Sequence, residues 1–443
     1  MKVLVVGNGA REHAIAAALN RSFQDVELFA FMTAVNPGIA RLCRQYTIGN
    51  TCNPDAVLDY ALISKIDMAV IGPEAPLDAG VVDKLEDKGV KCVGPRKAAA
   101  QIETDKTFCR SLMDKYKIKA CPLFGVFDNT ENACLYIDRA GMDIVVKPAG
   151  LTGGKGVKIM GEQVDSIGAK AYVKEVLDNR MGGIPKVVIE ERLIGEEFTL
   201  QAFVDGRNVV GMPMVQDHKR AYEGDTGPNT GGMGSYSDAG YVLPFLTKKD
   251  YDDGLSVMKE TVKAIKKETG VEYRGFLYGQ FMATKDGVKV IEYNARLGDP
   301  EAMNVLSVLE SDFAEVCDQV STGTLENNLK FAKKATVCKY MVPAGYPENP
   351  KKDVEVKVNE ERINGLGGQV YYASVREENG RIISSKSRSI AVLGMADTII
   401  GAESVVENCM NYVKGDLFYR RDIGTKPLIE KRIKHMKKLR GTK

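Results

Sequence analysis

A strand-like segment near residue 290 carries the side chains best suited to chemistry. Side chains alternate across a strand, so in Val288–Arg296 we expect Glu292, Asn294 and Arg296 to share one face. A carboxylate and an amide two residues apart are hard oxygen ligands suited to Mg²⁺, with ATP phosphates completing the shell, and Gln280 on the neighbouring hairpin strand offers a further oxygen. Arg296 would lie where negative charge develops in phosphoryl or acyl transfer. The alternative is an ordinary polar strand face with an exposed ion pair.

A glycine-rich stretch, Lys147–Val157, lies between two strand-like segments and contains four glycines and two lysines, Lys147 and Lys155. This pattern favours a hairpin flap that covers phosphates, because a purely structural glycine loop does not need lysines at its base and tip. It is not a P-loop, which would need glycine in place of Ala149 and a hydroxyl in place of Gly156.

The first strand-like segment is followed directly by Gly7, Asn8, Gly9 and Arg11, at the start of a helix. Glycines permit a sharp turn, and exposed helix N–H groups can hold an anion. A dinucleotide site would need a third glycine at position 12, where the chain has Glu12. A small phosphorylated ligand held partly by Arg11 therefore fits better than NAD, and a ligand-free β–α turn remains the alternative.

Two further segments are candidates for ligand contacts. Val187–Ile189 runs into Glu190, where a strand leaving its sheet could pair with an adenine edge, and Glu197 could bind ribose hydroxyls. A polar cluster, Gln216–Arg220, precedes a loop with many glycines, which indicates backbone close to a ligand. We expect substrate contacts in this cluster and after the strand near 290, at Asp217, Lys219, Gly298 and Asp299. His218 is more simply explained as a structural histidine than as a general base.

The elements that position these residues follow from local patterns. Short apolar runs at 2–6, 26–31, 68–71 and 91–93 alternate with helical patterns, which predicts a doubly wound parallel sheet. Asp205-Gly206 and Asp286-Gly287 predict hairpins in an antiparallel middle region. Short strands from about residue 335 predict a small β-rich C-terminal domain. The expected domains, of mixed α/β and α+β class, are 1–103, 104–330 with a flap subdomain at about 121–192, and 331–443.

Composition narrows the class of protein. A formal net charge of +2 over 443 residues argues against a dedicated nucleic-acid binder. We expect no membrane segment and no secretory signal, because apolar runs are short. Nine scattered cysteines without C-x-x-C and only three histidines make a zinc site improbable and favour a reducing cytoplasm. The basic end, 431–443, is expected to be a solvated helix and frayed tail, or else a weak electrostatic contact with a partner.

These motifs together resemble the phosphoribosylamine–glycine ligase family of ATP-grasp enzymes, nearly from end to end. Gln216–Arg220 and Asn229–Gly234 are specific to that family, whereas the flap and Glu-x-Asn are shared by ATP-grasp enzymes in general. The resemblance implies an N-terminal domain, an ATP-grasp core and a C-terminal domain. It also implies that ATP, glycine and 5-phosphoribosylamine give glycinamide ribonucleotide, ADP and phosphate through glycyl phosphate, in purine biosynthesis.

The resemblance assigns roles by position. The phosphate-binding lysines would be Lys106 and Lys147, with Lys155 on the flap; adenosine contacts would come from Glu190, Leu193 and Glu197; Mg²⁺ or Mn²⁺ would be held by Glu292, Asn294 and, in part of the family, Gln280. Arg296 would steady the acyl phosphate, and Gly7–Arg11 would hold the ribose phosphate.

The flap departs from the family pattern. Pro148-Ala149 stands where the family commonly has Ala-Asp, and Thr152-Gly153 where it has Ala-Ala, so flap closure is expected to differ.

Two rival functions stay open: another ATP-grasp ligase with a different acceptor, and a nucleotide-binding regulator without turnover. We expect a monomer or weak homodimer with no nucleic-acid or membrane partner.

Overall fold

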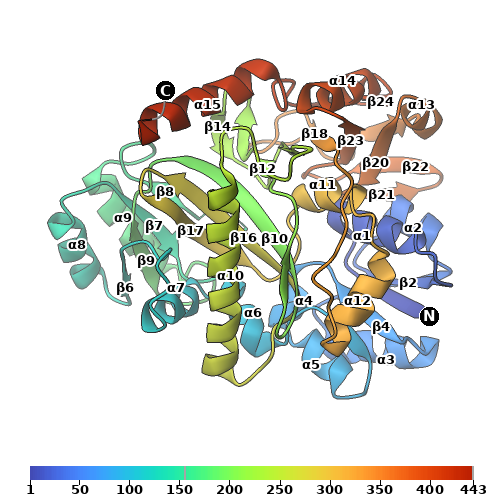
Figure 1. Cartoon of the computed structure of the whole chain (residues 1–443), viewed down its shortest axis with the longest axis horizontal. Coiled ribbons are helices and arrows are strands. Elements are labelled where there is room, and N and C mark those ends of the chain that lie inside the picture. Colours follow the sequence, from blue (N-terminus) through green and yellow to red (C-terminus); the bar gives the residue numbers. More distant parts are fainter. Residues whose placement is uncertain (154–155, 442–443) are drawn as a thin grey trace.

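The computed structural model describes residues 1–153 and 156–441. Figure 1 shows the N-terminal region in blue at the lower right, a teal subdomain at the left and the C-terminal region in orange and red along the top. The long yellow-green helix α10 (Lys248–Thr269) crosses the front of the middle region. In the described part of the chain, no helix is both long and apolar enough to cross a bilayer.

The N-terminal region is a parallel five-stranded sheet in the order β3-β2-β1-β4-β5. Its strands are β1 (Lys2–Val6), β2 (Glu27–Met32), β3 (Gln45–Ile48), β4 (Met68–Ile71) and β5 (Lys91–Val93). Its helices are α1 (Ala10–Asn20), α2 (Pro37–Leu42), α3 (Pro54–Ser64), α4 (Glu74–Asp78), α5 (Val81–Glu86) and α6 (Lys97–Thr104). Every residue of β4 is buried, so both faces of the sheet are covered, and the predicted doubly wound sheet is confirmed. The short helix α4 was not predicted.

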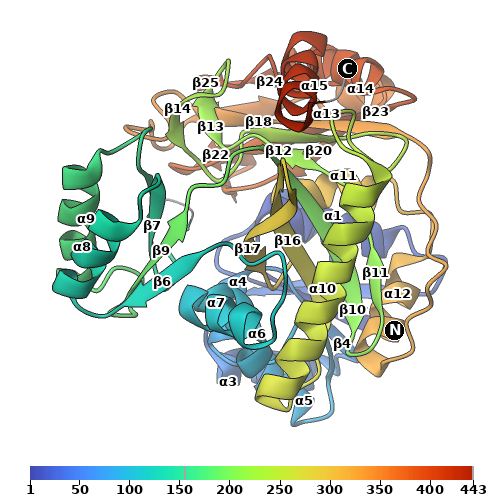
Figure 2. The same ribbon diagram turned by 60° about the vertical axis from the view of Figure 1, so that its left-hand side comes forward.

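The teal flap subdomain has a core of its own. It consists of β6 (Phe124–Phe127), α8 (Thr130–Arg139), β7 (Ile144–Pro148), β8 (Lys158–Ile159), α9 (Ser166–Asp178) and β9 (Val187–Glu191). Its sheet has the order β6-β9-β7-β8, and β7 and β8 form the predicted flap hairpin. Side chains of α8 and α9 pack on this sheet as a separate apolar cluster, and Figure 2 shows the subdomain standing to one side. The subdomain is thus packed as a unit.

An antiparallel sheet, β11-β10-β16-β17, forms the centre of the molecule. Its strands are β10 (Glu196–Asp205), β11 (Val209–Gly211), β16 (Arg274–Thr284) and β17 (Gly287–Asn294), which confirms both predicted hairpins. The helices of this region are α7 (Lys106–Lys115), α10, α11 (Glu301–Ser307) and α12 (Phe313–Thr322). A bulge interrupts the β16–β17 ladder: Gln280 pairs with Glu292, but Phe281 pairs with Val290, which leaves Ile291 without a partner residue.

The C-terminal region includes strands from the middle of the chain. β12 (Gln216–Asp217) and β15 (Gly234–Ser237) join β18 (Ala335–Pro343) in the sheet β12-β15-β18-β23-β20. Along the chain, the segment between β12 and β15 forms a separate small hairpin of β13 (Arg220–Tyr222) and β14 (Thr226–Asn229). The remaining elements are β19 (Glu355–Val358), α13 (Glu360–Gly365), β20 (Gly368–Tyr372), β21 (Val375–Glu378), β22 (Arg381–Ser384), β23 (Ile390–Ala396), α14 (Ile399–Met410), β24 (Val413–Lys414), β25 (Leu417–Phe418) and α15 (Lys426–Arg440). One sheet therefore spans the boundary expected at residue 331.

The basic C-terminal helix packs along one face, so the expectation of a wholly solvated helix is wrong, although Lys431, Lys434, Lys437 and Lys438 are exposed. Leu428, Ile429 and Met436 of α15 are buried. Arg432 bonds Glu196 and Asp225, and Arg440 forms two bonds to Asp250 (2.7 and 2.9 Å) at the start of α10. Arg432 and Arg440 thus fasten α15 to the middle region.

Candidate functional site

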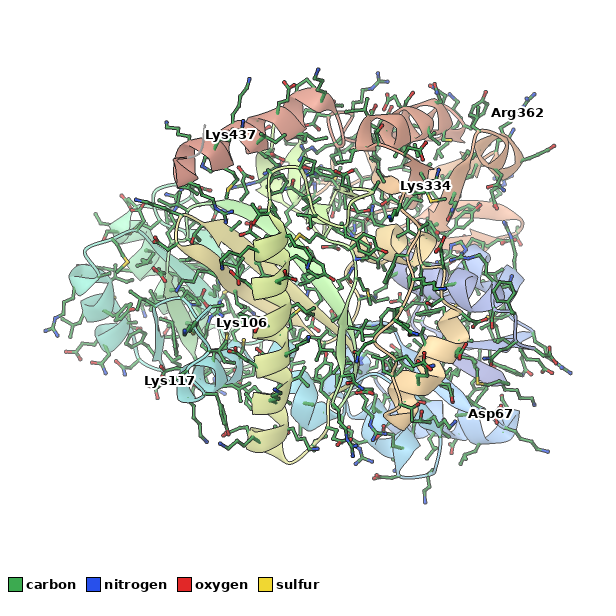
Figure 3. The ribbon with its side chains drawn as sticks, in the orientation of Figure 1. Asp67, Lys106, Lys117, Lys334, Arg362 and Lys437 are labelled. Atoms are coloured by element: carbon green, nitrogen blue, oxygen red, sulfur yellow. The ribbon has the colours of Figure 1, made fainter. Side chains whose placement is uncertain are left out.

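Two predicted phosphate lysines lie beside the base of the flap. Lys106, the first residue of α7, donates from Nζ to the Gly150 carbonyl (2.9 Å), and Figure 3 labels it on the side of the molecule where the flap subdomain lies. Lys147 on β7 donates to Glu190 (2.8 Å) and to the Ile291 carbonyl (3.2 Å), which the bulge leaves free of ladder pairing. The predicted flap-tip residue, Lys155, lies outside the described residues.

Glu190 is more enclosed than a surface strand end. Its carboxylate accepts from Arg110 Nε (2.7 Å) and Nη2 (3.0 Å) as well as from Lys147, and all three side chains are buried. Burial alone would raise the pKa of Glu190, but Arg110 and Lys147 outweigh it and lower that pKa to about 2. The carboxylate therefore orients Lys147, while the predicted adenosine contacts Leu193 and Glu197 lie in and after the partly exposed loop that follows β9.

Glu292 lies where several lysine charges converge. Burial would raise its pKa, but the positive charges of Lys219, Lys147 and Lys106 outweigh burial and lower it, so the carboxylate stays ionised. Lys219 Nζ is 4.0 Å from Glu292 Oε1 and donates to Gln280 Oε1 (2.6 Å). Gln280 in turn donates to Glu197 (2.5 Å), which links three predicted ligand-binding residues in one chain of contacts.

The residues on β17 fit a hard divalent cation. Within 1–153 and 156–441, no three His, Cys, Asp or Glu side chains gather into a metal site by themselves. Glu292 and Asn294 instead offer one carboxylate and one amide oxygen, the type of incomplete oxygen set that Mg²⁺ shares with substrate phosphates. Gln280 Oε1 is engaged by Lys219, so its availability to a cation depends on movement of that lysine.

Arg296 lies just beyond β17 between two carboxylates. Its Nε donates to Glu74 (3.2 Å) and its Nη2 is 3.0 Å from Glu103. Burial would lower its pKa, but both carboxylates raise it, so Arg296 keeps its charge. The guanidinium is held in place before any ligand binds, which suits a group that stabilises a developing anion.

The first glycine loop is built around Glu12. Gly7 has φ +117°, and a Cβ there would approach the Glu12 side chain within 2.7 Å. The Glu12 carboxylate accepts from the Gly9 backbone (2.5 Å) and from Arg11 Nε (2.5 Å), while Arg11 also donates to the Leu297 carbonyl (3.2 Å). A buried carboxylate inside the turn opposes a dinucleotide diphosphate, in agreement with the sequence argument against NAD.

The predicted substrate residues come together beside this loop. A Cβ on Gly9 would lie 4.0 Å from Asp299 Oδ2, and Gly298 donates to Gln201 (2.8 Å). Asp217 lies near Gly232, and its Oδ1 has no hydrogen-bond partner among the described residues. Burial and the nearby Glu301 raise the pKa of Asp217. The loop after β1, the cluster 216–220 and the segment after β17 thus face a common region.

The two histidines near these segments have structural surroundings. His218 Nδ1 is 3.3 Å from Asp225, a carboxylate that Arg420 and Arg432 also bind. His13 Nδ1 accepts from the Tyr372 backbone (3.0 Å). Burial lowers both histidine pKa values to about 4, so both rings are neutral at pH 7. Neither contact set points to a general base.

Four buried or half-buried residues of the site were missed from the sequence: Glu74, Glu103, Arg110 and Arg388. Arg388, after β22, pairs with Asp299 (3.1 Å) and donates to the carbonyls of Gly231 and Gly232. Glu74 follows the Gly72-Pro73 turn, and this acidic residue at a strand end was a usable signal. The other three lie far along the chain from their partners, so spacing could not reveal them.

Comparison with known proteins decides the family. The family described as phosphoribosylglycinamide synthetase matches through its N domain at residues 1–103, its ATP-grasp (A) domain at 104–302 and its C domain at 336–426. The chain belongs to the phosphoribosylamine–glycine ligase family. The phosphoribosylamine–glycine ligase of Methanosarcina barkeri is 53% identical over 444 residues, and that of Methanocella arvoryzae 52% identical over 443, with 100% of each chain covered.

Comparison with solved structures supports the same family and fold. A phosphoribosylamine–glycine ligase from Thermotoga maritima superposes with a TM-score of 0.81 at 28% identity, covering 95% of this chain and 100% of that one. The biotin carboxylase domain of a Hydrogenobacter thermophilus 2-oxoglutarate carboxylase has a TM-score of 0.70 at 15% identity, covering 98% and 93%, and so shares the fold alone. The predicted fold class and ATP-grasp ligase family are confirmed.

Proposed function

We propose that this chain joins glycine to 5-phosphoribosylamine at the expense of ATP, giving glycinamide ribonucleotide, ADP and phosphate in purine biosynthesis. The observation that carries the proposal is the convergence of Lys106, Lys147 and Lys219 on the ionised Glu292 carboxylate. This arrangement suits a polyphosphate bound with a divalent cation, because the cation would pair with the carboxylate and the lysines with the phosphates. Membership of the family identifies the other two substrates as glycine and 5-phosphoribosylamine.

The reaction balances in two steps. A glycine carboxylate oxygen bonds to the γ-phosphorus as the bond to ADP breaks, which gives glycyl phosphate. The amine of phosphoribosylamine then attacks the acyl carbon, a C–N bond forms, phosphate leaves and the amine nitrogen loses a proton. Little acid–base help is needed, since the carboxylate is already ionised and the amine attacks in its neutral form. Positioning, charge neutralisation and exclusion of water would supply the catalysis.

The chain's own residues divide this work. Lys106, Lys147 and Lys155 would bind the phosphates of ATP, and Arg296, held by two carboxylates, would steady the acyl phosphate. Glu292 and Asn294, with Gln280, would hold Mg²⁺ or Mn²⁺, which when bound neutralises phosphate charge.

The remaining predicted contacts fall at the two ends of the site. Adenosine would be contacted by Leu193, Glu197 and the strand end at Glu190, whose own carboxylate is held by Arg110 and Lys147. The sugar phosphate and glycine would be contacted by Gly7, Asn8, Gly9, Arg11, Asp217, Lys219, Gly298 and Asp299. The enzyme would act in the cytoplasm as a monomer or weak homodimer, without nucleic-acid or membrane partners.

The test is ADP release with ATP, Mg²⁺ and glycine, with and without freshly generated phosphoribosylamine. Turnover that requires both glycine and phosphoribosylamine supports the proposal. Turnover that is independent of either points to another ATP-grasp ligase with a different acceptor. Bound ATP without any ADP release supports the regulatory alternative.

A further inference from the structure

A single buried carboxylate from the N-terminal region contacts three consecutive residues of the proposed catalytic strand end. Glu103 lies at the end of α6, and only 4% of its side chain is exposed. Its Oε2 accepts from the Ala295 backbone N–H (2.6 Å), and its Oε1 is 3.0 Å from Arg296 Nη2. In the proposed function this carboxylate only holds Arg296 in place.

Asn294 completes the contact. With the amide oriented so that both of its ends are satisfied, Nδ2 donates to Glu103 Oε1 (3.2 Å) and to the Tyr293 carbonyl (3.0 Å), while Oδ1 accepts from Arg296 Nη1 (3.1 Å). Asn294, Ala295 and Arg296 are therefore all tied to one side chain. The β17 ladder ends at Asn294. Beyond it, the contacts with Glu103 hold Ala295 and Arg296 in place of strand pairing.

We propose that Glu103 is a positioning residue that orients Asn294 as a metal ligand and Arg296 as an anion-stabilising group. The inference rests on the proposed function, in which Asn294 binds the divalent cation. A glutamate suits the task because its two carboxyl oxygens accept hydrogen bonds, and all three of its neighbours present donors. Partners of this kind set the direction of a ligand's lone pair, and their loss typically weakens metal binding.

A neighbouring glutamate provides a matched control. Glu74 also binds Arg296 through a carboxylate (3.2 Å), yet in the part of the chain that the structure describes it contacts neither Asn294 nor the Ala295 backbone. E74Q and E103Q each replace one carboxyl group beside Arg296 with an amide. Only E103Q places an amide donor opposite the donors of Asn294 and Arg296.

The experiment measures binding rather than turnover. A non-hydrolysable ATP analogue is titrated calorimetrically into the wild type, E103Q and E74Q, each with and without Mg²⁺. In E103Q the gain in affinity produced by Mg²⁺ should fall about tenfold while metal-free affinity is unchanged, and E74Q should keep the full gain. Equal losses with and without Mg²⁺, equal behaviour of the two variants, or an unchanged gain in E103Q would each overturn the inference.

A second measurement separates orientation from folding. If Glu103 acts through Asn294, adding E103Q to N294A should cause no further loss of the Mg²⁺ effect, whereas additive losses would contradict the inference. A lower melting temperature of E103Q with a full Mg²⁺ effect would make Glu103 purely structural and overturn it. A wild type whose nucleotide affinity ignores Mg²⁺ would overturn the metal assignment and this inference together. Failure of the glycine or phosphoribosylamine dependence would leave these binding results unaffected.

Discussion

Glu292 shows how a half-buried charge can remain available to a ligand. Its carboxylate is ionised because Lys219, Lys147 and Lys106 surround it, yet its nearest lysine nitrogen, on Lys219, is 4.0 Å away. Glu190, by contrast, is bonded directly to Arg110 and Lys147. The two carboxylates therefore have different tasks: Glu190 is committed to positioning a lysine, and Glu292 can pair with a cation when phosphates occupy the lysines.

Glu292→Ala should reduce turnover by at least about 100-fold, because loss of a metal ligand removes several kcal/mol of transition-state stabilisation. The fold should be retained, since the carboxylate takes no direct hydrogen bond from its lysines in the described structure. Initial rates of ADP release and circular dichroism measure the two effects. Glu131→Ala, at an exposed position of α8, is the control and should match the wild type. Wild-type activity in the Glu292 variant would contradict the metal assignment.

Helices and strands were predictable wherever their signals were local. The Asp-Gly hairpins and the buried strand runs depend on neighbouring residues, and they appear as expected. The bulge at Ile291 has no sequence signal, although it frees the carbonyl that Lys147 and Arg110 bind. Glu103 meets Ala295 across 192 positions, so only the folded chain brings them together. For α15, charge count misled, while the helical spacing of Leu428, Ile429 and Met436 already indicated a packed face.

At the scale of elements, Arg432 tests whether α15 supports the site. Arg432→Ala should lower the free energy of unfolding by about 1–3 kcal/mol, because Glu196 and Asp225 each lose a largely buried arginine partner. ATP affinity should fall as well, since Glu196 directly precedes the proposed ribose contact Glu197. Urea unfolding and nucleotide titration measure these effects.

Lys437→Ala, on the exposed face of the same helix, is the matched control for charge and should change neither quantity. Equal losses in the two variants would show that α15 acts only through its overall positive charge, and no loss in either would show that Arg432 does not support the site.

Across the whole molecule, ion pairs join parts of the chain that are far apart in sequence. Glu74 of the N-terminal region binds Arg296 of the middle region, and Arg110 of α7 binds Glu190 of the flap subdomain. Burial would raise the pKa of each glutamate, but their arginine partners lower both pKa values to about 2. Both carboxylates therefore bind protons more weakly in the folded than in the unfolded chain.

Stability should consequently fall as the pH drops below 4.5. The contribution of Glu190 and Glu74 is fully present above their usual pKa of 4.5 and is lost as the pH falls from 4.5 toward about 2. Urea midpoints at pH 7, 4 and 3 measure this slope. Glu190→Gln should be less stable than the wild type at pH 7. It should also lose less stability on acidification, because glutamine does not titrate. An equally steep loss of stability with falling pH in that variant would show that Glu190 does not contribute to the acid sensitivity.

The shared sheet of the C-terminal region limits how the chain can be divided. β15 hydrogen-bonds to β18, so a C-terminal fragment starting at residue 331 would expose the backbone edge of a nine-residue buried strand. Such an unpaired edge invites association with other chains. A chimaera that exchanges C-terminal regions between relatives must therefore carry residues 216–237 with them, although these residues precede the exchanged region by about a hundred positions. The C-terminal region is therefore encoded by two separate stretches of the gene.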